Sequence, residues 1–410
     1  MNKWQSTMLV YDDYEKRVAN ARSLKKYRDL TDENVKKDVI SEVKKVLSFK
    51  DELVPEISKM EEVRKDVYDT FDVIQLRYET WENFYGCATL FMPHTDKKVP
   101  LVFVLCGHGE HGRLSDGYMK MAHQFAKNGV AALVPDNIGQ GSRQDIERKN
   151  HNYCYEPFYL GLSLQGLIAM ETVALIRYFK SKDEFDETKF ASCGNSGGGT
   201  LNLFLCALSN ELSAIAPSGY PSEFSYILSK ERRHCACNIL PGILSGPEMW
   251  EVASVFAPKP ILLSQGLNDD LIPIDLAKRN ARKVENVYIQ FGKRENFNFE
   301  CTKTKHSWEE SDIKIISDFI FKSLGIIDYK EFEDGFDVKR DLWKVEIPDK
   351  SFTTSKMCEN ITGKKVPDNI RLCDIFRPKY KGEILDENII EKDIGRGDVM
   401  HILAQFESMF

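Results

Sequence analysis

The sequence predicts an α/β fold with a doubly wound, mostly parallel sheet, and three observations support this prediction. Short apolar runs alternate with helical patterns from about residue 78 to 325. The run at residues 101–105 is apolar at every position, as buried parallel strands are. The segment Gly194-Asn195-Ser196-Gly197-Gly198-Gly199 lies between an apolar run and a helical pattern, which indicates a sharp strand-to-helix turn. Such alternation places helices on both faces of one sheet.

Seven apolar runs are the expected strands. They are residues 86–92, 101–105, 131–134, 190–193, 214–217, 261–264 and 287–291. Residues 164–179 carry Leu167, Ile168, Val173 and Ile176 at helical spacing, so we expect a helix there. The segment 292–305 is long and charged, and we interpret it as an insertion.

The two ends of the chain differ from this central region. Residues 1–77 are expected to form an N-terminal helical extension or cap, because apolar residues recur at helical spacing behind the candidate N-cap Thr31-Asp32-Glu33. Residues 326–410 mix glycine, proline and charge with short apolar pieces at 342–347, 382–390 and 399–403. We predict a small C-terminal β-rich appendage or an extended wrap for them. The central domain is expected to span residues 78–325.

Composition excludes several classes of function. The chain has 410 residues, of which 42% are hydrophobic, and a formal net charge of -7, so no basic surplus favours nucleic acid. No apolar run is long enough to span a bilayer, and no secretion signal is evident after the N-terminal methionine. The ten cysteines follow no disulfide framework. We therefore expect a cytoplasmic protein with reduced thiols and no membrane partner.

Ser196 is the candidate nucleophile, because it is the central residue of a G-x-S-x-G pattern between a strand and a helix. A serine hydroxyl needs a base, and the base needs an orienting acid. Asp269 follows the expected strand 261–264 and is the candidate acid. Asp270 could take that role instead, and a capping or turn aspartate is the non-catalytic alternative.

His306 is the candidate base. It is the one histidine that follows Asp269 and precedes the C-terminal segment, which gives the order Ser, Asp, His along the chain. A surface loop histidine is the alternative interpretation.

The segment Cys106-Gly107-His108-Gly109-Glu110-His111-Gly112 follows the strand at 101–105 and is a candidate oxyanion loop. The expected amide donors are Gly197 and His108, with Glu110 as the second choice for the latter. Two histidines and a glutamate in this loop make a metal site the rival interpretation, but the glycines favour close backbone approach. His234-Cys235-Ala236-Cys237 resembles half of a zinc site, and no second ligand pair stands out.

No metal and no cofactor are therefore expected. The glycine run at 194–199 lacks the lysine and the spacing of a phosphate-binding loop, and it does not fit a dinucleotide motif.

With these residues in place, residues 80–325 resemble the α/β-hydrolase superfamily, and within it the branch of dienelactone hydrolases and acetyl xylan esterases. The resemblance depends on the motifs below, with Cys106 standing where such enzymes usually have a histidine. The motifs are Phe84-Tyr85-Gly86-Cys87-Ala88-Thr89-Leu90-Phe91-Met92-Pro93, Cys106-Gly107-His108-Gly109-Glu110-His111-Gly112-Arg113, Asp136-Asn137-Ile138-Gly139-Gln140-Gly141-Ser142-Arg143, the run Cys237 to Leu244 with Glu248-Met249-Trp250, and Ala257-Pro258-Lys259-Pro260. The resemblance implies Ser196, Asp269 and His306 as catalytic residues.

The resemblance implies a serine esterase that cleaves a small acyl ester, acetyl above all, of a sugar or small metabolite. The expected partner is this small-molecule ester, and a homodimer through the flanks stays open. The alternatives are a peptidase or amidase, a C–C or lactone hydrolase, an acyltransferase, and a scaffolding role of the flanks. The candidate substrate-binding residues are Glu110, His111, Asn195, Trp250 and Trp308.

Overall fold

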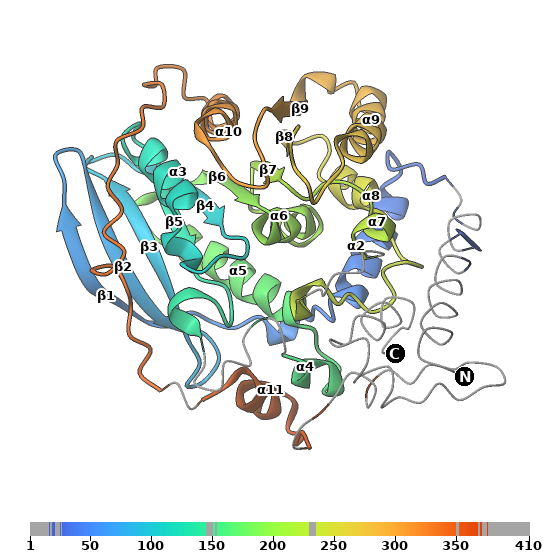
Figure 1. Cartoon of the computed structure of the whole chain (residues 1–410), viewed down its shortest axis with the longest axis horizontal. Coiled ribbons are helices and arrows are strands. Elements are labelled where there is room, and N and C mark those ends of the chain that lie inside the picture. Colours follow the sequence, from blue (N-terminus) through green and yellow to red (C-terminus); the bar gives the residue numbers. More distant parts are fainter. Residues whose placement is uncertain are drawn as a thin grey trace.

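The computed structural model describes residues 16, 19, 20, 25, 27–144, 151, 154–228, 235–349, 352–367, 370 and 375. Within them, nine strands form one sheet in the order β1-β2-β3-β5-β4-β6-β7-β8-β9 (Figure 1). The strands are β1 Ser58–Val67, β2 Phe71–Glu79, β3 Tyr85–Pro93, β4 Val99–Leu105, β5 Ala131–Pro135, β6 Phe185–Asn195, β7 Ala214–Ser218, β8 Ile261–Gly266 and β9 Phe297–Thr302.

The sheet has an antiparallel part and a parallel part. β1, β2, β3 and β5 pair antiparallel, whereas all pairs from β5 through β4 to β9 are parallel. The carboxyl ends of the parallel strands meet at one edge, and in a sheet of this kind that edge positions functional loops. This is the predicted doubly wound, mostly parallel sheet.

Helices cover both faces of the sheet and bury two separate cores. Alternate residues of β4 enter different cores, with Leu101 and Phe103 on one face and Val102 and Val104 on the other. The α-helices are α2 Glu33–Val46, α3 Asp116–Ala126, α4 Glu156–Tyr159, α5 Leu164–Lys180, α6 Gly197–Leu208, α7 Phe224–Leu228, α8 Met249–Ser254, α9 Ile274–Gln290, α10 Glu310–Ser323 and α11 Thr354–Thr362. The predicted helix at 164–179 is α5.

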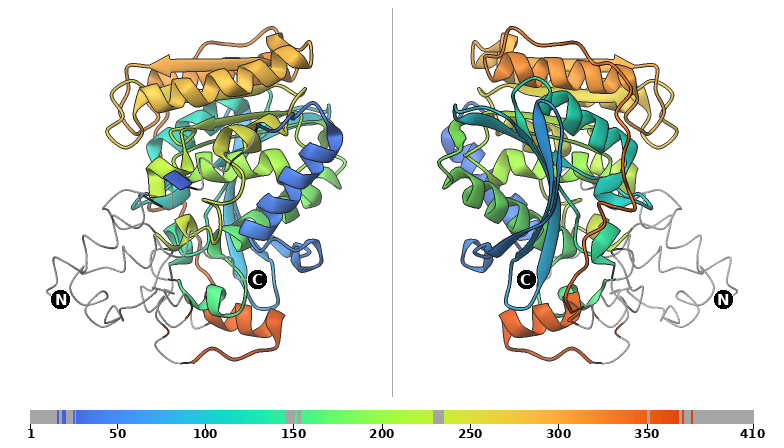
Figure 2. Two further views of the ribbon diagram at one scale, coloured as in Figure 1. Left: turned by 90° about the vertical axis from the view of Figure 1, so that its right-hand side faces the viewer. Right: turned by 90° about the vertical axis from the view of Figure 1, so that its left-hand side faces the viewer.

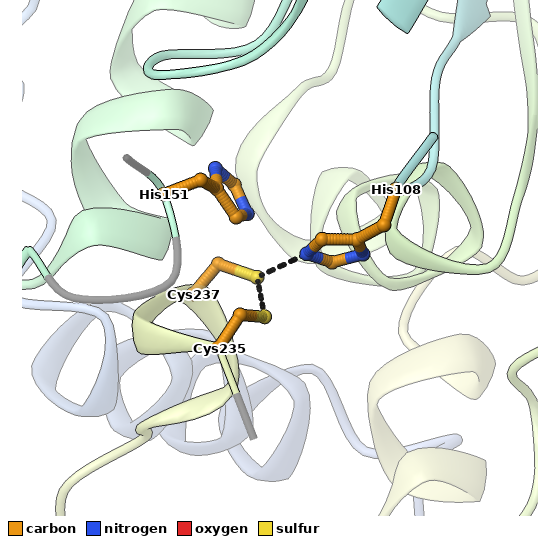
Figure 3. A group of neighbouring side chains, drawn as sticks. All are labelled: His108, His151, Cys235 and Cys237. Atoms are coloured by element: carbon orange, nitrogen blue, oxygen red, sulfur yellow. Dashed lines mark hydrogen bonds between the residues drawn. The ribbon is translucent and has the colours of Figure 1, made fainter. Parts of the chain in front are cut away.

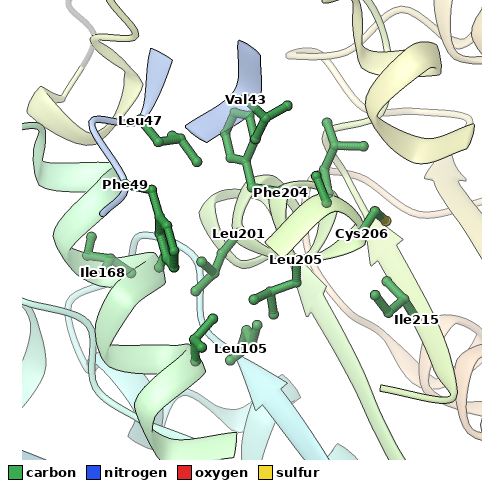
Figure 4. Close-up of a cluster of buried hydrophobic side chains, with 14 of the residues drawn as sticks. Val43, Leu47, Phe49, Leu105, Ile168, Leu201, Phe204, Leu205, Cys206 and Ile215 are labelled. Carbon is green, nitrogen blue, oxygen red and sulfur yellow. The ribbon is translucent and has the colours of Figure 1, made fainter. Parts of the chain in front are cut away.

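The N-terminal region is only partly helical. Asp32 caps α2 as expected, because its side chain accepts a hydrogen bond from the Asn34 amide. The buried face of α2 packs on α6, where Val43 and Leu47 lie in one apolar cluster with Phe204 (Figure 4). The prediction of helix up to residue 77 is wrong for residues 58–77, which form β1 and most of β2.

The C-terminal segment starts as a strap and continues into a helix. From residue 326 it runs without a strand through residue 349, passing α3 and the β1–β3 end of the sheet before α11 (Figures 1 and 2). The described part therefore matches the expected extended wrap and does not contain the β structure that was the other expectation. Residues 382–390 and 399–403 lie outside the described residues.

One predicted strand is wrong. Residues 287–290 end α9, and Val287 and Tyr288 belong to its buried face together with Val284. The strand that pairs with β8 is β9, which lies inside the segment interpreted as an insertion. No helix among the described residues combines the length and apolar content that a membrane crossing requires.

Candidate active site

Ser196 lies at the turn between β6 and α6, in a backbone conformation that few non-glycine residues adopt. Its φ is 57° and its ψ is -118°, which is a strained position of the kind found at functional sites. The neighbouring chain is tightly packed, since a Cβ added to Gly198 would lie 2.0 Å from the Leu105 carbonyl oxygen. A Cβ at Gly194 would lie 2.4 Å from Asn202 Nδ2. The glycines of the motif therefore permit the turn.

His306 and Asp269 reach Ser196 from the ends of two neighbouring strands. Asp269 follows β8 and His306 follows β9, so the parallel register brings both loops to the same edge. His306 Nε2 lies 2.8 Å from Ser196 Oγ, and His306 Nδ1 lies 2.8 Å from Asp269 Oδ2. Serine, imidazole and carboxylate thus form one continuous hydrogen-bonded chain.

The Asp269 carboxylate is fixed by four hydrogen bonds. Besides His306, Gln265 Nε2 donates to Oδ2 at 2.8 Å, and the amides of Leu271 and Ile272 donate to Oδ1 at 2.7 and 3.1 Å. Burial on its own raises the pKa of this carboxyl group. The hydrogen bond and charge of His306, with the Leu271 and Gln265 hydrogen bonds, outweigh burial, so the pKa lies below its usual value. The site therefore holds Asp269 ionised.

The loop after β4 lies directly against the Ser196 turn. A Cβ added to Gly107 would lie 2.8 Å from Ser196 Cβ, and one added to Gly197 would lie 3.1 Å from His108 Nδ1. The Gly107 amide donates to the Tyr118 hydroxyl at 2.7 Å. These contacts place His108 beside Gly197, the two residues expected to supply the amide donors.

Two of the residues expected to bind substrate lie behind the serine. Trp308 is buried, and its Nε1 donates to Ser218 Oγ at 3.2 Å. Ser218 Oγ in turn donates to Asn195 Oδ1 at 3.3 Å, and the Ser218 carbonyl accepts from the Ser196 amide at 3.0 Å. Both side chains therefore contact the framework of the turn.

The other three expected residues lie in different places. Glu110 and His111 are exposed in the loop after β4. Trp250 stacks on Tyr27, with 6.4 Å between ring centroids, in a surface pocket that residues of α8 and α9 line. Glu110 and His111 thus belong to the loop beside the serine, whereas Trp250 belongs to another surface.

Three positioning residues were missed by the sequence analysis. Gln265 supports Asp269, Tyr118 holds the Gly107 amide, and Asn137 Nδ2 donates to the Cys106 carbonyl at 2.8 Å. Asn137 belongs to the quoted Asp136–Arg143 motif, so its position carried a signal. The sequence carried no signal for Tyr118, because a tyrosine on the apolar face of an amphipathic helix is normally interpreted as a core residue.

The same motif builds a buried ionic framework under the site. Asp136 pairs with the fully buried Arg113 and accepts hydrogen bonds from the amides of Arg113 and Ser142 at 2.7 and 3.1 Å. Arg143 Nη1 lies 2.6 Å from Glu171 Oε2 on α5. Each buried charge therefore has a partner, as burial requires.

One group of side chains in the described part of the chain could hold a metal ion. His108, His151, Cys235 and Cys237 offer ligand atoms that all lie within 4.8 Å of one another. His234, which was considered with the two cysteines, lies outside the described residues.

Comparison with known proteins adds a family to this geometry. The family model of acetyl xylan esterase (AXE1) matches residues 22–234, which is more than half of the chain. This range includes Ser196 and ends before Asp269 and His306. A search of curated proteins finds no match.

Solved structures of esterases have a similar fold. Methylesterase BT1017 superposes with a TM-score of 0.61 at 20% identity, over 85% of this chain and 75% of that one. Acetyl Xylan Esterase 1 from Thermoanaerobacterium sp. gives 0.52 at 16% identity, over 70% and 93%. A glucuronoyl esterase from Solibacter usitatus gives 0.53 at 11% identity, over 69% and 91%.

At these identities the structures establish the fold alone, and this fold is the α/β-hydrolase fold that the sequence predicted. The family model matches more than half of the chain and decides the family. The chain belongs to the acetyl xylan esterase family and is a serine-dependent α/β-hydrolase that cleaves carboxylic esters.

Proposed function

We propose that this enzyme removes a small acyl group, acetyl before others, from a sugar or a small metabolite, with Ser196 as nucleophile, His306 as base and Asp269 as orienting acid. One observation carries the proposal, namely the continuous chain from Ser196 Oγ to His306 to Asp269 with 2.8 Å at each link. Family membership supports the acetyl ester as substrate.

The proposed mechanism follows from this chain. His306 Nε2 takes the hydroxyl proton while Ser196 Oγ attacks the ester carbonyl, and Asp269 stabilises the imidazolium that forms. The amides of Gly197 and His108 donate to the oxyanion. The protonated imidazole then gives its proton to the leaving alcohol. Water, deprotonated by His306, attacks the acyl-enzyme and releases the acid and free Ser196.

Glu110 and His111 are the residues we propose to contact the alcohol part of the substrate. They are exposed in the loop that carries His108. Asn195 and Trp308 are proposed to act through the backbone of the serine turn, because their contacts are to Ser218. A carboxylate and an imidazole exposed in this loop are suited to hydrogen bonds with sugar hydroxyls.

Labelling with a fluorophosphonate probe tests the nucleophile. We expect wild type to be labelled at Ser196 and the Ser196→Ala variant to be silent, with both melting at the same temperature. Ser181→Ala is the matched control, since Ser181 is exposed at the end of α5. Full labelling or full esterase activity in Ser196→Ala would overturn the assignment.

Product analysis tests the substrate class. Acetylated xylo-oligosaccharides, methyl uronate esters and acyl anilides are offered to wild type and to Ser196→Ala. We expect wild type to release acetate, because the chain belongs to the acetyl xylan esterase family. Release of methanol without acetate would assign the sugar to the acyl side of the ester. Faster cleavage of anilides would favour the peptidase or amidase alternative.

We further propose that the protein is cytoplasmic, that it is related to dienelactone hydrolases and that it forms a homodimer. Cell fractionation tests the first, lactone hydrolysis the second and light scattering at several concentrations the third.

A further inference from the structure

Four side chains that the reaction does not use converge beside the serine turn. His108 comes from the loop after β4, His151 precedes α4, and Cys235 and Cys237 flank the first residue of the short 3-10 helix Ala236–Asn238. Figure 3 shows all four directed toward one shared space. Cys237 Sγ lies 3.4 Å from His108 Nε2 and 2.7 Å from Cys235 Sγ. The Ala236 amide also donates to the His151 carbonyl, which joins two of these segments.

His151 is oriented as a ligand would be. Its Nδ1 lies 2.8 Å from the Ile138 carbonyl oxygen, an acceptor, so Nδ1 carries the proton and Nε2 keeps a free lone pair. The side chain is 4% exposed, and among the described residues Nε2 has no hydrogen-bond partner. A backbone carbonyl on the far ring nitrogen is the usual support of a metal-binding histidine. A buried ring nitrogen without a partner calls for an explanation, and a bound ion is one that also accounts for the neighbouring thiols.

The donor set matches one class of metal. Two thiolates and two imidazoles form the tetrahedral shell that Zn²⁺ prefers, with Zn–S near 2.3 Å and Zn–N near 2.0 Å. In such a shell a sulfur and a nitrogen lie about 3.5 Å apart, and the Cys237–His108 distance of 3.4 Å is close to this value. The two sulfurs would need to move about 1 Å apart from their 2.7 Å contact, to about 3.8 Å. A rotation of the Cys235 side chain supplies such a movement.

The surroundings allow an ion to enter and to stay. His108 is exposed and Cys235 is half-buried, so the cluster has an opening to solvent. His151 and Cys237 are buried. A charged cation in this position would be surrounded by its ligands and shielded on the inner side.

We propose that His108, His151, Cys235 and Cys237 bind one Zn²⁺ ion in a closed tetrahedral site. Four protein ligands leave no open position for water or substrate, so the site is structural. The ion would cross-link three segments far apart in the sequence. One of them carries His108, whose ring lies against Gly197. The site would therefore fix the loop beside the nucleophile. This zinc proposal does not depend on the proposed ester chemistry.

Metal content of the whole protein tests the proposal first. Wild type is purified without chelator, dialysed against metal-free buffer and analysed by mass spectrometry of the elements. We expect about one zinc ion per chain. Cys301→Ser is the matched control, because Cys301 is a half-buried cysteine on β9 outside the cluster. Ser196→Ala should carry the same zinc as wild type, which separates this result from the test of the nucleophile.

Ligand variants test which residues hold the ion. Cys235→Ser and His151→Gln should bind Zn²⁺ at least about 10-fold more weakly than wild type in competition with a chromophoric chelator. The variant Cys301→Ser should bind it as wild type does. Equal affinity in all four proteins, or no zinc in wild type after titration with Zn²⁺, would overturn the proposal.

Cobalt gives a readout that does not depend on the variants folding. Wild type stripped by a chelator is titrated with Co²⁺ alone. The proposal expects the intense visible bands of tetrahedral cobalt together with thiolate-to-cobalt charge transfer. Weak octahedral bands without charge transfer would contradict it. The remaining possibility is a disulfide between Cys235 and Cys237. Alkylation of the protein without reductant, followed by mass spectrometry, detects such a disulfide, and its presence would also exclude the zinc site.

Discussion

At the residue scale, two adjacent carboxylates show how placement decides chemistry. Asp269 is buried and accepts hydrogen bonds from His306, Gln265 and two amides, whereas Asp270 is exposed. The two side chains are chemically identical, so the environment alone assigns the orienting role. Sequence spacing left both residues as candidates.

Replacing Asp269 by asparagine should therefore lower kcat by about 10⁴-fold, with the fold retained. The amide group donates to His306 Nδ1 and stabilises the tautomer that cannot accept the serine proton. Asp270→Asn is the control and should keep near wild-type turnover. Steady-state kinetics with a chromogenic acetate ester measures both. A large loss in Asp270→Asn with turnover kept in Asp269→Asn would exchange their roles.

His123 on α3 predicts a dependence of stability on pH. Burial first, and then Lys127, lower the pKa of its ring to about 4. The ring stacks on Phe336 with 4.4 Å between centroids. Between its unfolded pKa of about 6.5 and the folded value, the unfolded chain binds the proton and the folded chain does not. Neutral His123 therefore does not reduce the free energy of unfolding above the unfolded pKa of about 6.5. Stability is lost as the pH falls from there toward about 4, because protons then bind the unfolded chain preferentially.

The variant His123→Phe removes that proton uptake. Its free energy of unfolding should fall less than that of wild type between about pH 6.5 and pH 4. Urea denaturation at several pH values measures the difference between the two proteins. Curves that run parallel over this interval would show that His123 titrates normally in the folded protein.

At the residue scale, the sequence predicts those site residues whose order and spacing along the chain follow a known pattern. Ser196 and Asp269 follow strands that the sequence predicts, and His306 is the one histidine between Asp269 and the C-terminal segment, so the order along the chain identifies three residues that meet in space. Trp250 has no such ordering, and an indole near a typical motif does not say which surface it joins. His151 is far in sequence from Cys235 and Cys237, so only folding reveals the second pair of the proposed zinc site.

At the element scale, the same limits explain the misplaced strand. Short apolar windows do not distinguish a strand from the buried face of a helix. Val287 and Tyr288 look like a strand by themselves, but with Ala277, Ala281 and Val284 they follow the helical period of α9. β1 was not predicted for the opposite reason. It is a charged edge strand whose residues are mostly exposed, so it has no apolar run to recognise.

The C-terminal strap depends on Trp343, and this gives a prediction of stability. The side chain is fully buried, it contacts Phe91 and Phe336, and its Nε1 donates to Asp66 at 2.6 Å. Trp343→Ala should lower the free energy of unfolding by about 3–5 kcal/mol.

Leu342→Ala is the matched control for that variant. Leu342 is the preceding residue and is 54% exposed. Removal of the Leu342 side chain beyond Cβ should change the free energy of unfolding by no more than about 0.5 kcal/mol. Urea denaturation compares the two. Similar small changes in both variants would mean that the strap adds little to the stability of the core.

At the scale of the whole molecule, the flanks are parts of the hydrolase core. β2 pairs along its whole length with β3, and its side chains enter both cores, as Phe71 and Ile74 do on opposite faces. α2 covers α6, the helix that begins directly after Ser196. The strap closes the other face with Phe336 and Trp343. The division at residues 77 and 325, which composition indicated, cuts through β2 and separates these contacts, so we expect that residues 78–325 do not fold on their own.

A chain restricted to residues 78–325 is the sharpest test of that division. It would lack α2, β1, most of β2 and the strap, and so would expose Phe91, Phe204 and the antiparallel edge of β3. An uncovered apolar edge strand favours association over folding. We expect this fragment to aggregate or to lack a cooperative thermal transition, while the full chain melts cooperatively. Circular dichroism and fluorophosphonate labelling measure both proteins. A fragment that melts cooperatively and is labelled at Ser196 would show that residues 78–325 are an independent domain and that the flanks only decorate it.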